Sequence, residues 1–137
     1  MPIPLYKSKV KHYSHGVTKD VVLPKILLQE PLDFDMIAER ISKSSTASQG
    51  DVYLVLEQLE KQLIFALQNA QPVKLGRLGA FYPQITSSCS DSAEEVGVKN
   101  VKKFSCIFKP SKYLKQSFED ARYIFVDKAI DNAKLKL

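Results

Sequence analysis

Residues that commonly build metal or redox sites are scarce in this chain of 137 residues. It contains two histidines and two cysteines, and the cysteines, Cys89 and Cys106, form neither a ligand cluster nor a disulfide framework. His12 and His15 lie outside any helical pattern with only Asp20 nearby, so we interpret them as surface histidines rather than metal ligands. We therefore expect no bound metal and a reducing cytoplasm.

Constellations typical of enzymes are also missing. The sequence shows no convincing nucleophile with a base, carboxylate pair or phosphate loop. Gly76-Arg-Leu-Gly79 lacks the Lys-Ser/Thr of a P-loop, and Cys89 lies in a serine-rich, acidic loop that would not lower the pKa of its thiol. We predict that the protein is not an enzyme and takes no cofactor and no small-molecule substrate.

Long hydrophobic runs are absent as well. No stretch approaches the roughly 18 apolar residues that a membrane helix requires. The opening residues, 1–6, show no charged region followed by an apolar one, so we expect no export signal and no membrane partner. The 45% of hydrophobic residues suffices for one core, and 26% of charged residues argues against disorder.

The net charge of +5 is unevenly distributed along the chain. Residues 1–30 carry +3, residues 31–71 carry −3, residues 72–118 carry +5, and residues 119–137 are neutral. Such segregation favours binding of a polyanion by the basic part of the chain. The alternative is that these lysines only keep the protein soluble.

Two helices are predicted in the acidic part. The first runs from Phe34 to about Lys43, with Asp33 as N-cap and one apolar face. The second starts after Ser48, which can accept a hydrogen bond from the N–H of Asp51. Its apolar stripe is wide enough to need partners on more than one side, and in a domain this small a second subunit is a plausible partner.

The basic part changes to short strands around two glycines, Gly76 and Gly79, spaced as a tight turn requires. We predict strands at 73–75, 79–86 and 98–108, and a short helix opening at Pro110 or Ser111. Pro83 places the second strand at an edge or beside a bulge. The third strand has no cleanly apolar face, which suits an exposed two-stranded arm, and 87–97 forms the polar loop at its tip.

The two ends of the chain are less regular. Residues 6–13 and 21–28 are typical of two short strands separated by a turn at 14–17, with Pro24 confining the second to an edge or bulge. Residues 123–126 fit a strand or a helical extension, followed by a polar amphipathic tail. We expect three segments: an N-terminal extension at 1–33, the main domain at 34–120, and a C-terminal extension at 121–137.

The motifs around the glycine turn resemble those of a known family. Pro72-Val-Lys-Leu-Gly-Arg-Leu-Gly-Ala-Phe81, followed by Ile107-Phe-Lys-Pro-Ser-Lys-Tyr-Leu-Lys115, is similar to the bacterial histone-like HU and integration host factor family. The closest resemblance is to a longer HU-related branch with residues before the first helix. The resemblance implies an α+β fold: a base of two helices, an antiparallel sheet with an extended β-arm, and a short C-terminal helix.

The same resemblance implies an intertwined dimer that binds double-stranded DNA in the nucleoid. Lysines of the arm would meet phosphates without reading sequence, and Ser111 between two lysines would form a helix N-terminus that attracts anions. The matching segment of the family lies beside the DNA backbone, which carries Lys109, Ser111 and Lys112 over as DNA contacts. The full set of expected contacts is Lys74, Arg77, Lys99, Lys102, Lys103, Lys109, Ser111, Lys112 and Lys115.

One departure from the family concerns the arm tip. Members that bend DNA strongly carry an Arg-Asn-Pro motif there, whose proline wedges between base pairs. Residues 90–95 contain no proline and three acids, which repel phosphates. We therefore expect low-specificity, architectural DNA binding without intercalation. The alternative is a structural or protein-interaction module that kept the HU fold and lost DNA binding.

Overall fold

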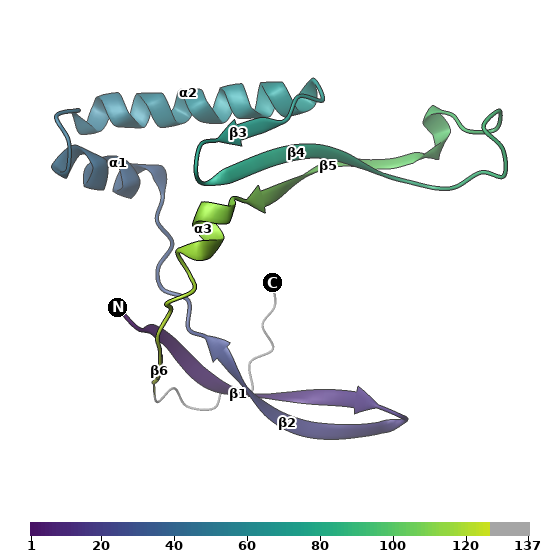
Figure 1. The fold of residues 1–137 in the computed structure, drawn as a ribbon, viewed down its shortest axis with the longest axis horizontal. Helices are drawn as coiled ribbons and strands as arrows, with labels where there is room; N and C mark the ends of the chain where they lie inside the picture. Colours follow the sequence, from purple (N-terminus) through teal and green to yellow (C-terminus); the bar gives the residue numbers. More distant parts are fainter. Residues whose placement is uncertain (127–137) are drawn as a thin grey trace. The chain divides into compact units, whose positions relative to one another are not determined.

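The computed structural model describes residues 1–126. It is a mixed α+β protein with two three-stranded sheets and two compact units (Figure 1). One unit joins Met1–Pro31 to the described residues from Asp120 to Val126, and the other comprises Leu32–Glu119. The polar tail expected after residue 126 lies outside the described residues.

The first unit is built on a long β-hairpin. β1 (Ile3–Ser14) pairs with β2 (Val17–Ile26) in antiparallel fashion over ten residue pairs, and β6 (Tyr123–Phe125) joins the other side of β1 in parallel. The chain turns at His15 and Gly16, whose φ angles of 51° and 80° are those of a tight two-residue hairpin turn. Both strands are longer than predicted, and Pro24 lies in an edge strand as expected.

The two helices of the second unit begin where their capping residues predict. α1 (Phe34–Lys43) starts after Asp33, whose carboxylate accepts a hydrogen bond from the N–H of Met36 at 2.9 Å. α2 (Gln49–Gln68) starts after Ser48, which accepts from the N–H of Asp51 at 3.1 Å. Each cap gives a partner to one backbone N–H that a helix start leaves unpaired.

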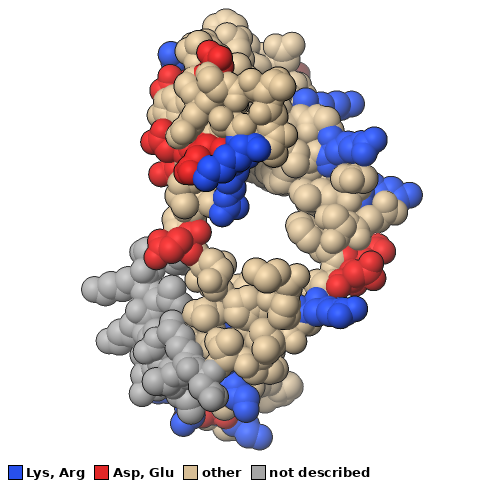
Figure 2. Space-filling model, turned by 90° about the vertical axis from the view of Figure 1, so that its left-hand side faces the viewer, with Lys and Arg blue, Asp and Glu red and all other residues tan. Residues whose placement is uncertain are grey.

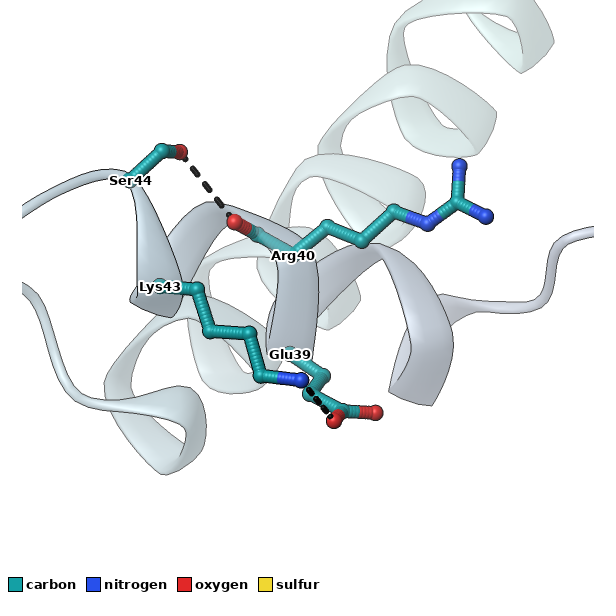
Figure 3. Close-up of polar contacts among 4 residues, drawn as sticks. All are labelled: Glu39, Arg40, Lys43 and Ser44. Carbon is teal, nitrogen blue, oxygen red and sulfur yellow. Dashed lines mark hydrogen bonds and ion pairs between the residues drawn. The ribbon is translucent and has the colours of Figure 1, made fainter.

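The last turn of α1 is stabilised by side chains of its own. Lys43 Nζ lies 2.6 Å from Glu39 Oε1, one helical turn away, and the hydroxyl of Ser44 donates to the carbonyl of Arg40 at 3.1 Å (Figure 3). The Lys43 ammonium lowers the pKa of the Glu39 carboxyl below its usual 4.5, first through this hydrogen bond and then through charge. Both side chains are exposed, so the pair adds little stability.

The sheet of the second unit has the strand order β3-β4-β5, with both pairs antiparallel. β3 (Val73–Leu75) is short, while β4 (Gly79–Ser87) and β5 (Val101–Pro110) extend beyond it as a two-stranded arm (Figure 1). Pro83 lies past the last β3–β4 pair, where β4 is an edge strand, as its missing N–H requires. α3 (Lys112–Gln116) follows, with Ser111 as its N-cap.

Gly79 determines how closely β4 and β5 approach. Its φ is 151°, and a Cβ at this position would lie 2.3 Å from the carbonyl oxygen of Lys109 and 2.8 Å from the Phe108 ring. No other residue fits without displacing backbone. The glycine therefore permits the aromatic contact behind it, where the rings of Phe81 and Phe108 lie 5.0 Å apart.

The arm tip corrects one prediction. Val98–Asn100 was expected to begin the third strand, but it forms a 3-10 turn, η1. The cause is Asn100, which is buried: its side-chain amide donates to the carbonyl and hydroxyl of Ser88 and to the hydroxyl of Ser90, and its carbonyl oxygen accepts from the N–H of Gly97. A side chain that forms hydrogen bonds with the polar groups of a loop in this way competes with strand pairing.

The second unit buries few of its apolar residues. Its buried apolar residues are Ala38, Val52 and Ala80, each small or medium in size. Large apolar side chains of α2 stay exposed, including Phe65 at 65% and Val55 at 64%.

No helix within residues 1–126 is long and apolar enough to cross a membrane.

Candidate nucleic-acid interface

The β3–β5 sheet has two chemically different faces. Residues paired across antiparallel strands project to the same side, so the register sorts the side chains. One face of the arm is apolar, carrying Phe81, Pro83, Ile85, Phe104, Cys106 and Phe108. The expectation that the third strand has no cleanly apolar face is therefore wrong for 104–108, because Asn100 lies in the 3-10 turn and Lys102 lies where the register shifts.

The opposite face is basic near the glycine turn. Lys74, Ala80 and Lys109 are paired in one row across all three strands, and the small Ala80 separates the two exposed lysines. A shallow depression of about 240 Å³ lies here, lined also by Tyr82 and Ser111. Two lysine side chains beside an open depression have the charge that a phosphate group requires.

Two tyrosines hold cations of this region over their rings. Lys109 Nζ lies 5.0 Å from the ring centroid of Tyr82, and the Arg77 guanidinium carbon lies 4.9 Å from that of Tyr113. Cation–π contacts of this kind orient the charges while leaving them exposed. The sequence prediction missed both tyrosines, although Tyr82 shares the strand parity of Ala80 and could have been assigned to this face.

Ser111 connects the glycine turn to α3. Its hydroxyl donates to the carbonyl of Arg77 and accepts from the N–H of Leu114 at 3.0 Å, while its own N–H donates to the carbonyl of Leu78 at 3.0 Å. Ser111 is half-buried, whereas the eight predicted cations are exposed. Its visible role is to hold the Arg77 turn beside Tyr113.

The other predicted contacts spread outward from this centre. Lys103 lies opposite Thr86 on the basic face, further along the arm. Lys102 falls where the register shifts, in a β-bulge, and Lys99 lies in the 3-10 turn at the tip. Lys112 and Lys115 are on α3. The depression thus gathers Lys74, Lys109 and Ser111, with Arg77 in the adjoining turn.

Acidic residues are excluded from these elements. β3, β4, β5 and α3 contain no aspartate or glutamate. Carboxylates instead surround Tyr53 on α2, where Glu57, followed by Asp35, raises the pKa of the phenol. Figure 2 shows a row of Lys and Arg side chains along one edge of this unit, and on its opposite side Asp and Glu side chains together with further Lys and Arg side chains.

Within residues 1–126, no group of three or more histidine, cysteine, aspartate or glutamate side chains could hold a metal ion. No curated protein matches the chain. Among solved structures, the chain is similar to one named "Putative bacterial DNA binding protein" from Bacteroides vulgatus, with a TM-score of 0.61 and 16% identity. The match covers 90% of this chain and 48% of the other, so the chain spans about half of that protein.

The family comparison is consistent with the resemblance noted in the sequence. A family model, HU-HIG, matches residues 1–124, and its description reads "HU domain fused to wHTH, Ig, or Glycine-rich motif". The match includes the N-terminal hairpin, both helices, the sheet with its arm, and α3. The chain therefore belongs to the HU-HIG family of HU-related proteins.

Proposed function

We propose that the protein binds double-stranded DNA with low sequence specificity, as an architectural component of the cytoplasmic nucleoid. The DNA-binding domain is 34–120, flanked by extensions at 1–33 and 121–137. The contacts are the eight exposed cations of the sheet, arm and α3, while Ser111 acts through the turn that it holds. Family membership and the name of the similar structure support this assignment.

The observation that carries the proposal is the basic face of the sheet. Lys74 and Lys109 flank one depression, Arg77 lies over Tyr113, and the surrounding elements contain no carboxylate. Lysine and arginine side chains arranged in this way contact phosphates, which position a protein on DNA without reading its bases. Binding energy then comes chiefly from the release of counterions. If the bound form neutralises about six phosphates, log affinity falls with log salt at a slope of about −5.

We further propose that the binding form is an intertwined homodimer, with a helical base below a sheet and two arms. The support is the amount of apolar surface that one copy leaves exposed. The exposed residues Ile41 and Val55 line an apolar depression of about 310 Å³ between α1 and α2, and Phe65 is exposed at the other end of α2. A second copy that covers these side chains would complete a core that one chain leaves small.

A second function is favoured by the arm tip. Asp91, Glu94 and Glu95 lie in the loop that Asn100 closes, where they would repel phosphates. An interaction module with the HU fold and without DNA binding would present this tip to a protein partner. If DNA is bound, we expect the arm to follow the duplex without wedging a proline between bases.

The test is fluorescence anisotropy of a labelled duplex at several salt concentrations. We compare the wild type with Lys74→Gln/Lys109→Gln, which removes both cations of the depression. Because the proposed dimer carries the depression twice, we expect the double variant to bind at least about tenfold more weakly at moderate salt and the salt slope to become shallower by up to about 4.

The matched control is Lys43→Gln/Lys61→Gln, which removes the same charge from α1 and α2. This control should retain nearly wild-type affinity. If the two double variants lose affinity equally, binding reflects net charge rather than the basic face. If the wild type fails to bind even at low salt, the interaction-module function replaces DNA binding.

A further inference from the structure

The two faces of the sheet in the first unit differ in burial. Its register places Tyr6, Ser8, Val10 and Val21 on one side, where Tyr6 and Ser8 are buried. The other side carries the odd-numbered residues of β1, together with the residues of β2 and β6 that pair with them. We call this exposed side the lysine face; its main members are Lys7, Lys9, Lys11, Tyr13, Val22, Tyr123 and Phe125.

Cations on this face form a regular row. Lys7, Lys9 and Lys11 occupy alternate positions of β1 and are all exposed. Residues two apart along a strand are separated by about 6.8 Å, which is comparable to the distance between successive phosphates of an extended nucleic acid strand. Asp20, opposite Lys11, is the only carboxylate that β1, β2 and β6 place on this face.

Aromatic rings lie on the same face and are open to solvent. Tyr13 is 73% exposed, Tyr123 63% and Phe125 54%. Lys7 Nζ lies 5.9 Å from the centroid of the Phe125 ring, which places the row of cations directly beside the β6 rings. Contact between water and exposed aromatic rings is unfavourable, and stacking with a flat, apolar partner would remove this contact.

From this juxtaposition we propose that the lysine face binds single-stranded nucleic acid. Proteins that bind single strands combine a positive surface that tracks the backbone with aromatic side chains on which bases stack. The phosphates of a duplex could contact the lysines, but its bases could not stack on the aromatic rings, because they are already stacked on one another within the helix. Single-stranded DNA and RNA share the required chemistry: a phosphate row and unpaired bases.

This site is independent of the duplex-binding face on β3–β5, because it uses a different sheet and different residues. The two activities are therefore separable by mutation. Charge reversal on the lysine face should impair single-strand binding alone. Loss of Lys74 and Lys109 should impair duplex binding and leave the lysine face active.

The experiment measures anisotropy of a labelled oligothymidylate of about 12 nucleotides against the full chain, with excess unlabelled duplex present. An oligouridylate of the same length is measured in parallel to separate a DNA preference from an RNA preference. The first matched pair is Lys9→Glu and Lys19→Glu, which reverse one exposed charge on opposite faces of the same hairpin. We expect Lys9→Glu to weaken binding about tenfold and Lys19→Glu to change it less than about twofold.

A second matched pair tests stacking without any change of charge. Phe125→Leu removes a ring from the lysine face, and Ile124→Leu changes the adjacent residue on the other face of β6. We expect Phe125→Leu to weaken binding about fivefold or more and Ile124→Leu to leave it unchanged. Ultraviolet cross-linking of the wild-type complex should join the oligonucleotide to the peptide that contains Tyr123 and Phe125. Circular dichroism confirms that each variant is folded.

Several results would overturn the proposal. One is complete displacement of the oligonucleotide by duplex, which would assign binding to the β3–β5 face. Another is an equal loss from Lys9→Glu and Lys19→Glu, which would indicate a general charge effect. A third is unchanged affinity in folded Phe125→Leu. Retained single-strand binding in Lys74→Gln/Lys109→Gln would support the site, even if the wild type binds no duplex at all.

Discussion

The helices of the second unit and the basic face of its sheet differ in both charge and exposed apolar surface. Residues 31–71, which contain α1 and α2, carry −3, whereas residues 72–118 carry +5. The helices also leave Val55 and Phe65 exposed, while the basic face of the sheet exposes mainly lysines. Partition of this kind suits two partners: an apolar surface for another protein chain and a cationic surface for a polyanion. It also disfavours binding of a duplex against the helices, because their carboxylates repel phosphates.

The largest effect should follow from placing charge on the helical apolar surface. In Val55→Glu/Phe65→Glu, association of two copies would bury unpaired carboxylates, so we expect the dimer to dissociate into monomers. Sedimentation velocity measures the mass of the particle. Gln62→Glu, an exposed polar position on the same helix, should leave the dimer intact. A double variant that stays dimeric would place the dimer interface elsewhere.

Replacing glycine with alanine should change the free energy of unfolding in opposite directions in the two regions. Gly79→Ala puts a Cβ against the Lys109 carbonyl, and we expect it to cost about 2–4 kcal/mol of unfolding free energy. Gly50→Ala in α2 meets no atom within 4 Å, and we expect it to add a few tenths to about 1 kcal/mol. Urea denaturation of both variants measures the difference. Equal effects of the two changes would contradict the tight approach of β4 and β5.

The smallest effect concerns the ion pair of α1. Lys43 holds the pKa of Glu39 below 4.5, so the pair contributes stability above that pH and loses it as the pH falls through the lowered pKa. Glu39→Gln should therefore lower the melting temperature slightly near neutral pH and not at all in strong acid. Glu60→Gln is the matched control on α2. A difference between wild type and Glu39→Gln that persists in strong acid would exclude the ion pair as its cause.

Much of the fold was predictable because its signals are local. Asp33 and Ser48 cap their helices as predicted, since a capping hydrogen bond spans only three residues. Strand Val73–Leu75 has the predicted bounds, and Ser111 is the N-cap of the short helix. The resemblance to HU-related proteins is confirmed by the family match.

Errors arose where distant residues determine the conformation. Val98–Asn100 has strand-like composition, but Asn100 is held by Ser88 and Ser90 across the loop. The apolar face of the arm required the partners that β4 supplies, and these depend on a register that includes a bulge. The parallel pairing of β6 with β1 joins residues more than a hundred positions apart, which no local pattern indicates.

For the basic face, the sequence by itself determined which residues are available. β3, β4, β5 and α3 contain six lysines and no carboxylate, and Arg77 and Lys99 lie in the turns between them. Composition and local spacing suffice for that, because they do not depend on how the chain closes. Only the tertiary structure decided that Lys74 and Lys109 flank one depression, that Arg77 lies over Tyr113, and that Ser111 holds their turn. The physical reason is that strand register and the close approach at Gly79 set these neighbours, and both depend on contacts between segments far apart in the chain.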